Sequence, residues 1–267
     1  MAETGGSRPT ISGCIIAFQE EEHITACVQS LRACCDEVLV VDSGSTDRTR
    51  ELAAAAGARV VVNAPFPGHL EQKQLAADLA RHDWVFSVDA DERVTPELAA
   101  RVRALQAEGL VPPAYEMPRR NHYLGRVLRG GIFVPDRKVR LFHRGHARWG
   151  GRNPHDKVIV DPAAGAPIRL REPLEHFSYR DLRDHLRTID KFTSIAARSL
   201  REEGRRFRWR DLLLRPPAVF AKSLILKLGV RDGWRGVLIA AMAFYYDWLK
   251  YWRLRAQWRL AKGSQSS

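Results

Sequence analysis

The chain has 267 residues, of which 45% are hydrophobic and 28% charged, and it carries a formal net charge of +12. This length and composition are typical of one large folded domain, or of one domain with an appendage, and they exclude an intrinsically disordered chain. The four cysteines have neither metal-ligand nor disulfide-framework spacing, so we expect no zinc site and a reducing compartment. No apolar stretch precedes Pro9, so no secretory leader is expected.

The positive charge is concentrated near the C-terminus. Residues 198–262 contain sixteen lysines and arginines against five aspartates and glutamates, a net charge of +11. The rest of the chain is therefore close to neutral. This asymmetry predicts two parts that meet different surroundings.

Strands and helices are expected to alternate through the first 110 residues. Apolar runs and amphipathic spacing place them in the order strand 11–18, helix 24–31, strand 37–41, helix 49–56, strand 59–62, helix 69–80, strand 84–88 and helix 96–105. This alternation predicts an α/β fold with a Rossmann-like, mostly parallel central sheet and helices on both faces. Ligands of such sheets bind beyond the carboxyl ends of the strands, so the site is expected there.

Carboxylates follow three of the four expected strands. The first strand leads into residues 18–22 (FQEEE), the second into 42–47 (DSGSTD) and the fourth into 89–92 (DADE). Residues 20–22 also suit the acidic first turn of a helix, and residues 42–47 suit a turn with a helix cap.

The third group is the densest. Asp89, Asp91 and Glu92 repel one another unless a cation lies among them. Divalent cations prefer such oxygen ligands, and they neutralise charge on a departing phosphate. The sequence therefore predicts a divalent metal at the end of the fourth strand.

These three motifs, in this order, resemble those of family 2 glycosyltransferases of the GT-A fold. The resemblance continues through residues 115–156 and the C-terminal tail, where it is similar to the lipopolysaccharide core branch, of the heptose I β-1,4-glucosyltransferase type. It implies an inverting transferase that moves a sugar from a nucleotide-sugar donor, a UDP-hexose, to a glycolipid or glycan acceptor such as the lipopolysaccharide core.

The resemblance also implies roles for the motif residues. Glu20 and Asp42 would contact the base and the ribose, Asp89 would contact the ribose or the sugar, and Asp91 would hold Mg²⁺ or Mn²⁺ on the diphosphate. The residues expected to bind the nucleotide sugar are Phe18, Glu20, Asp42, Ser45 and Asp89.

Residues 111–178 lose the alternation and are interpreted as the acceptor half of a catalytic domain that spans residues 1–178, with residues 10–110 as the nucleotide-sugar half. The residues expected on the acceptor side are Gly130, Gly131, Asp136, Arg140 and His155.

An inverting displacement needs a carboxylate that accepts the proton of the acceptor hydroxyl. Asp156 is the candidate, because it follows His155 where the family usually has His-Glu. Asp136 and Glu175 are the alternatives, and an ordinary surface ion pair of Asp156 remains open.

Residues 179–267 are expected to form a basic, helical, amphipathic extension that is broken at Pro216–Pro217. The uncharged stretch 236–246 is too short to span a bilayer, and tryptophans and tyrosines then alternate with basic residues. This pattern favours an anionic membrane surface. Packing on the catalytic domain and binding of nucleic acid are the alternatives. We expect peripheral attachment to the cytoplasmic face of the cell membrane and no nucleic-acid partner.

Two other functions remain open from the sequence. One is a transferase on the same fold that makes polyprenyl-phosphate sugars or extends another glycan. The other is a non-catalytic basic protein that binds membranes or nucleic acid, although such a protein has no evident need for the carboxylates of residues 89–92.

Overall fold

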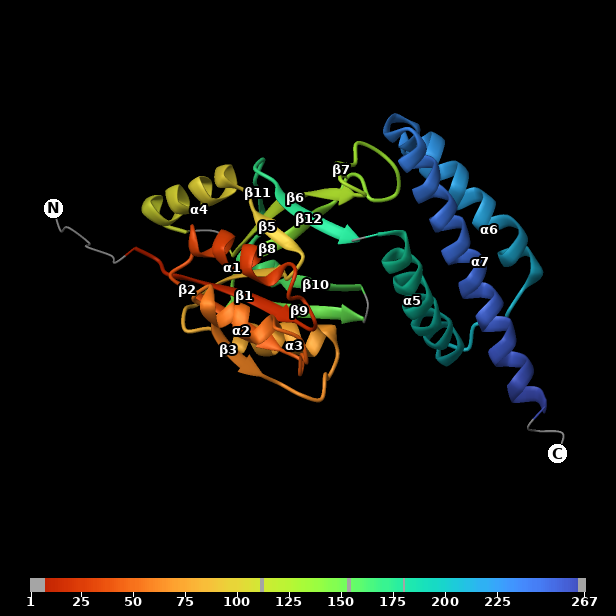
Figure 1. The fold of residues 1–267 in the computed structure, drawn as a ribbon, viewed down its shortest axis with the longest axis horizontal. Coiled ribbons are helices and arrows are strands. Elements are labelled where there is room, and N and C mark those ends of the chain that lie inside the picture. The colour runs from red at the N-terminus through yellow and green to blue at the C-terminus, as the bar shows by residue number, and fades with distance from the viewer. Residues whose placement is uncertain (1–7, 111–112, 153–154, 180, 264–267) are drawn as a thin grey trace. The chain divides into compact units, whose positions relative to one another are not determined.

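The computed structural model describes residues 8–110, 113–152, 155–179 and 181–263 (Figure 1). The chain divides into two compact units. The first, here called the sheet unit, comprises Met1–Arg120 and Asp136–His176, and the second, the helical unit, comprises Asn121–Pro135 and Phe177–Ser267.

Four parallel strands form the centre of the sheet unit. They are β1 (Ile11–Ala17), β2 (Glu37–Asp42), β3 (Arg59–Val62) and β4 (Trp84–Asp89). Their order is β3-β2-β1-β4, and each neighbouring pair is parallel. The predicted parallel sheet is confirmed, and β2 and β4 both end at an aspartate.

Helices cover both faces of these strands. They are α1 (Ile24–Arg32), α2 (Thr49–Ala55), α3 (His69–Asp78) and α4 (Pro96–Glu108). Successive residues of a strand point to opposite faces, so Val40 packs in the core with α1 and α4, whereas Leu39 and Val41 pack in the core with α3. Burial on both faces explains why β1, β2 and β4 read as nearly continuous apolar runs.

Antiparallel strands extend the sheet beyond β4, where the order continues β8-β6-β12-β5. The remaining strands are β5 (Glu92–Val94), β6 (Ala114–Tyr123), β7 (Arg126–Val127), β8 (Arg137–His143), β9 (Ala147–Arg152), β10 (His155–Val160), β11 (Ile168–Arg169) and β12 (Leu174–Tyr179), with a 3-10 turn η1 at Pro162–Ala164. Strands β9 and β10 pair only with each other, and β9 packs against α3.

Three helices dominate the helical unit: α5 (Leu182–Glu202), α6 (Trp209–Ala221) and α7 (Trp234–Gly263). Figure 1 shows α5 and α6 lying along α7, and the short helical turns η2 (Lys222–Leu226) and η3 (Gly229–Asp232) connect α6 to α7. Their shared core consists of Ala197, Leu212, Tyr251 and Leu254. None of the helices described is long and apolar enough to cross a membrane.

The break expected at Pro216–Pro217 is wrong, because both prolines lie inside α6. Each proline removes one N–H donor, but packing of the buried face of α6 on the other helices stabilises the helix. Leu212 packs in the shared core, and the Asp211 carboxylate pairs with Arg205 and with Arg215, at 3.2 and 3.0 Å.

A buried polar contact joins residues 121–135 to α5. The Tyr123 hydroxyl and His185 Nδ1 are 2.8 Å apart, and the Tyr179 ring stacks on the imidazole at 4.0 Å. Burial lowers the pKa of His185 to about 4, so this imidazole is neutral at physiological pH.

Candidate active site

The loop after β2 is fixed by its own aspartate. Asp42 is fully buried, and its Oδ1 accepts hydrogen bonds from the backbone N–H groups of Gly44 and Ser45, at 3.0 and 2.8 Å. The Ser45 hydroxyl donates to the same carboxylate and accepts from the backbone N–H of Gln19, at 2.9 Å. Asp42 and Ser45 thus hold the loops after β1 and β2 together, while Phe18 beside them is 56% exposed.

A second bond ties the same two loops. The backbone N–H of Glu20 donates to the Thr49 hydroxyl at 2.8 Å. Thr49 is itself buried at the start of α2. The proposed donor residues Phe18, Glu20, Asp42 and Ser45 therefore lie on two loops that are connected by side-chain hydrogen bonds.

Asp89, at the end of β4, lies between two cations. Its carboxylate is 3.0 Å from Lys73 Nζ and 2.6 Å from a guanidinium nitrogen of Arg140. Burial alone would raise the pKa of Asp89, but the charges of Arg140 and Lys73 hold it well below its usual value. Asp89 is therefore ionised throughout the physiological range.

Glu92 is fully buried and satisfies its charge inside the protein. One oxygen accepts from Arg119 at 2.9 Å and from Arg140 at 2.5 Å, and the other accepts from the backbone N–H of Asp89 at 2.9 Å. The repulsion among these carboxylates, which we expected a metal to relieve, is thus relieved for Asp89 and Glu92 by basic side chains.

Asp91 has a different neighbour. Its Oδ2 lies 3.3 Å from His176 Nε2, and the two side chains are 28% and 14% exposed. His176 reaches this place because β12 pairs antiparallel with β5, with His176 opposite Glu92. A carboxylate and an imidazole so placed can supply two ligands to a divalent cation. The residues described contain no cluster of three or more acidic, histidine or cysteine side chains that would hold a metal without help from a ligand.

Asp156 lies on β10 with its side chain only 9% exposed, and it bonds to Lys73 Nζ at 2.8 Å. The same ammonium pairs with Asp89 and lies 4.7 Å from the centre of the Trp149 ring. Both carboxylates raise the pKa of Lys73, against the effect of its burial, so the ammonium stays charged. Lys73 therefore connects Asp156, the expected general base, to Asp89, which is expected to bind the nucleotide sugar.

The two alternative bases are also paired. Asp136 lies 2.6 Å from Arg119 and 3.4 Å from Lys138, and Glu175 pairs with Arg120. Because Arg119 also binds Glu92, the ion pairs form one chain of alternating charge. Its members, in order, are Asp156, Lys73, Asp89, Arg140, Glu92, Arg119 and Asp136.

Sequence reasoning missed Lys73, Arg119 and His176 as parts of this site. Lys73 lies on α3 in a segment that the sequence marks only as a helix, and Arg119 lies on β6 next to Arg120. No local spacing marks these residues, since each reaches the site through tertiary packing.

Three other residues were expected on the acceptor side, namely Gly130, Gly131 and His155. The backbone of His155 begins β10, but its side chain lies outside the described part of the structure. Gly130 and Gly131 belong to the helical unit. There, a Cβ on Gly130 would lie 2.3 Å from the carbonyl oxygen of Leu228, so this position requires glycine for close backbone packing.

The family model described as glycosyl transferase family 2 matches residues 12–154, more than half of the chain, and the chain belongs to this family. It is therefore a glycosyltransferase. The predicted Rossmann-like GT-A fold, with its mostly parallel sheet and helical extension, is confirmed.

Similar proteins carry related names. The lipopolysaccharide core biosynthesis glycosyltransferase LpsC of Rhizobium meliloti is 29% identical over 84% of this chain and 83% of its own length. An uncharacterized glycosyltransferase of Rickettsia typhi is 29% identical over 74% of this chain and 70% of its own. Among solved structures, glucosyl-3-phosphoglycerate synthase from Mycobacterium tuberculosis, in complex with Mg²⁺ and uridine-diphosphate, matches with 27% identity and a TM-score of 0.36. That match covers 43% of this chain and 44% of the synthase.

We expect Glu92→Gln to destabilise the protein by about 3 kcal/mol or more, because it leaves the buried guanidinium of Arg140 with one carboxylate instead of two. Urea unfolding measures this free energy. Glu97→Gln, an exposed position at the start of α4, is the matched control and should change stability by less than about 0.5 kcal/mol. A Glu92→Gln protein as stable as the control would show that Glu92 is not needed to balance Arg140.

Proposed function

We propose that this glycosyltransferase moves a hexose from a UDP-hexose to a glycolipid or glycan acceptor, such as the lipopolysaccharide core, with inversion at the anomeric carbon. The main support is that the Lys73 ammonium contacts the carboxylates of both Asp89 and Asp156. This contact is called the Lys73 bridge below. It supports a site in which a donor residue and a base face the same reacting centre. The relative named for lipopolysaccharide core biosynthesis supports the acceptor class.

The donor half of the proposal uses the ends of the parallel strands. The loops after β1 and β2 would receive the nucleotide, because Asp42 and Ser45 fix their backbone and Phe18 offers an exposed ring. Asp89 would receive a hydroxyl of the ribose or the sugar as an ionised acceptor. Lys73 and Arg140 add positive charge at the same strand end.

Asp91 and His176 fit a divalent cation, Mg²⁺ or Mn²⁺, because their donor atoms already lie 3.3 Å apart and both side chains remain partly exposed. The cation would neutralise charge on the departing diphosphate. Asp91 would hold it through a carboxylate oxygen and His176 through Nε2. Asp89 and Glu92 do not compete for this role, since basic side chains already bind them.

Asp156 would take the proton from the acceptor hydroxyl. Lys73 keeps this carboxylate in place, and Trp149 packs beside the ammonium and limits access of water. Asp136 shares Arg119 with Glu92, and Glu175 pairs with Arg120, whereas Asp156 shares Lys73 with Asp89 itself. The shared bridge therefore favours Asp156.

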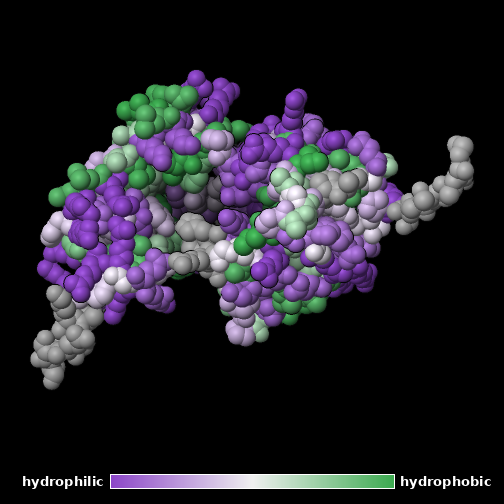
Figure 2. Space-filling view, turned by 180° about the vertical axis from the view of Figure 1, so that it is seen from behind, coloured by the Kyte–Doolittle hydropathy of each residue, from purple (hydrophilic) through white to green (hydrophobic). Residues whose placement is uncertain are grey.

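We further propose that the helical unit attaches the enzyme to the cytoplasmic face of an anionic membrane. Its exposed apolar residues support this: Leu213 and Leu226 are 64% and 77% exposed. Figure 2 shows hydrophobic residues gathered at one end of the helical unit. The net +11 of residues 198–262 would add attraction to anionic lipids. Of the three tryptophans expected as anchors, Trp248 and Trp258 pack against the helical core, whereas Trp252 is 42% exposed.

Removal of metal with EDTA should abolish transfer, and Mn²⁺ or Mg²⁺ should restore it. Asp91→Asn should lower turnover about a thousandfold because it removes a ligand of the cation that stabilises the leaving diphosphate. Asp83→Asn, an exposed carboxylate just before β4, is the matched control and should leave turnover unchanged. Full activity of Asp91→Asn, or activity in EDTA, would contradict the metal proposal.

Asp156→Asn should lower kcat by at least a hundredfold while donor affinity changes less than threefold, because a general base acts in the transition state. Steady-state kinetics and UDP titration measure the two effects. The same substitution at Asp136, and Glu175→Gln, should lower kcat far less. A collapse of donor affinity in Asp156→Asn would instead make Asp156 a residue of the donor site.

Replacement of Leu213 and Leu226 by serine should weaken co-sedimentation with anionic liposomes about tenfold, because both side chains would enter the bilayer interface. Added salt should release part of the bound wild-type protein. The control variant has serine in place of Val62 and Ile168, which are exposed apolar residues of the sheet unit. It should bind anionic liposomes as the wild type does. Equal binding by both double variants would refute this anchor.

A further inference from the structure

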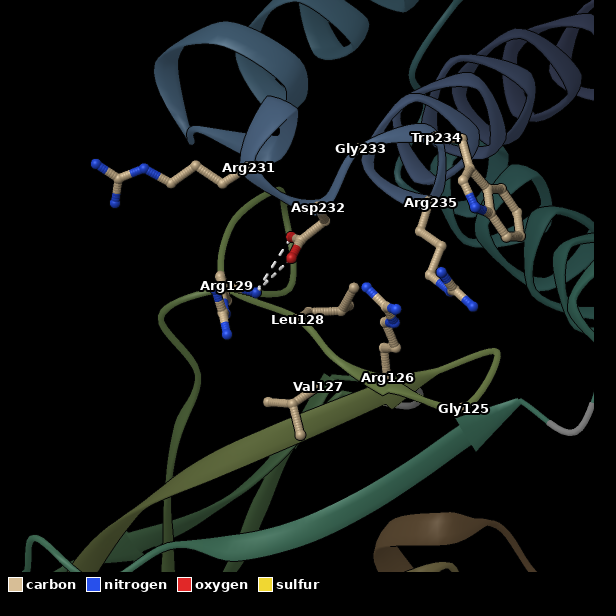
Figure 3. Close-up of a pocket in the computed structure, with 10 residues that line it drawn as sticks. All are labelled: Gly125, Arg126, Val127, Leu128, Arg129, Arg231, Asp232, Gly233, Trp234 and Arg235. Carbon is tan, nitrogen blue, oxygen red and sulfur yellow. Dashed lines mark hydrogen bonds between the residues drawn. The ribbon is translucent and has the colours of Figure 1, made fainter.

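The helical unit contains a cavity of about 680 Å³ outside the active site described above. It lies between residues 125–129, which include β7, and residues 231–235, which lead into α7 (Figure 3). Four of its ten lining residues are arginines, namely Arg126, Arg129, Arg231 and Arg235. A cavity so rich in guanidinium groups is suited to an anion.

The carboxylate in the lining does not neutralise these arginines. Asp232 accepts hydrogen bonds from the backbone N–H of Arg129, at 2.9 and 3.1 Å, and from that of Gly130, at 2.9 Å. Figure 3 shows the carboxylate directed at this backbone. Within the described residues, the four guanidinium groups form no ion pair with a carboxylate.

Arg235 is already oriented. Its Nε and Nη2 donate to the carbonyl oxygen of Leu124 at 3.2 and 3.0 Å, and its guanidinium lies 4.5 Å from the centre of the Trp234 ring. Figure 3 shows the guanidinium groups of Arg126 and Arg235 extending into the space between β7 and the start of α7, whereas Arg231 points away from it. Two like charges facing one space favour an anion between them.

The two walls of the cavity are joined by backbone contacts. The N–H of Gly131 donates to the carbonyl of Lys227 at 2.8 Å, and Gly130 packs directly on the backbone of Leu228. With the Asp232 bonds, these contacts fix residues 129–131 against residues 227–232. The cavity is therefore formed before a ligand arrives, which reduces the ordering cost of binding.

We propose that this cavity binds a phosphoryl group. The guanidinium fork matches phosphate oxygens in geometry and charge, and Arg126, Arg129 and Arg235 supply several donors around one space. The group can belong to a lipid headgroup or to a soluble phosphorylated molecule. Ile225, Leu226 and Val230, exposed just before the cavity residues, favour the lipid. That source rests on the membrane attachment proposed above, whereas phosphate binding does not.

The test uses the full chain and inorganic pyrophosphate, titrated by calorimetry at constant ionic strength with EDTA present. EDTA prevents metal-dependent binding of the probe at Asp91. Replacement of both Arg126 and Arg129 by glutamine should weaken binding at least tenfold, through the loss of charge-assisted hydrogen bonds. The control variant has glutamine in place of Arg206 and Arg210, which are exposed in the same unit and do not line the cavity. Its pyrophosphate affinity should stay within twofold of the wild-type value.

Equal pyrophosphate affinity in the cavity variant and the wild type would overturn the proposal. An equal loss of pyrophosphate affinity in the control variant would overturn it too. A loss of UDP affinity in the presence of Mn²⁺ in the cavity variant would also overturn it, because the cavity would then belong to the donor site. Retained UDP binding with lost pyrophosphate binding supports it, whether or not the proposed transfer reaction is correct.

A second arm identifies the source of the phosphate. Vesicles of phosphatidylcholine with phosphatidic acid are compared with vesicles that contain phosphatidylserine at matched surface charge. If the cavity binds a headgroup, the wild type should prefer phosphatidic acid and the cavity variant should lose this preference. If pyrophosphate binding falls in the variant and the vesicle preference does not change, the cavity serves a soluble phosphorylated molecule. Both outcomes support a phosphoryl site.

Discussion

The carboxylates at the end of β4 can share one edge of the sheet because basic side chains from three other elements lie among them. Arg140 comes from β8, Arg119 from β6 and Lys73 from α3. Each binds two carboxylates, so the carboxylates of Asp89, Glu92, Asp136 and Asp156 are connected through shared cations. A buried ion pair is costly to break on one side, and this cost fixes the relative positions of the candidate catalytic residues.

This arrangement separates the roles of three neighbouring carboxylates. Glu92 is fully buried and structural, and Asp89 is ionised and held by two cations. Asp91 alone turns to an imidazole at a partly exposed position. Residues that look alike in the sequence thus differ in chemistry because of what packs around them.

The parallel half of the fold could be predicted because β1, β2 and β4 are buried on both faces and α1 has a clear apolar stripe. Ile24, Cys27, Val28 and Leu31 are all buried on α1, as their spacing indicates, and the Thr95 hydroxyl caps α4 by accepting from the backbone N–H of Leu98. The strand-end rule also located the carboxylates correctly. These features depend on residues close together in the chain, so local sequence patterns predict them.

The partners of the carboxylates could not be predicted in the same way. Lys73 and Asp156 are 83 residues apart, and Arg140 and Asp89 are 51 apart, so no local period records either pair. The continuity of α6 through Pro216–Pro217 has the same origin, since packing on α7 decides it. Likewise, no local pattern distinguishes the aromatic residues of α7 from one another: Tyr251 is buried in the shared helical core, whereas Trp234 and Trp252 are 60% and 42% exposed.

The bond between the backbone of Arg129 and the side chain of Asp232 spans 103 positions of the chain. On the ribosome, residues 121–135 emerge long before residues 227–232, on which they pack, have been synthesised. The parallel strands of the sheet unit use contacts within the first 90 residues and can form early. The contacts of residues 129–131 with residues 227–232 must wait until synthesis is nearly complete. The helical unit is therefore the last part of the molecule to mature. A ribosome that stalls before residue 232 releases a chain in which residues 129–131 lack the Asp232 carboxylate, although Tyr123 can already pack on α5.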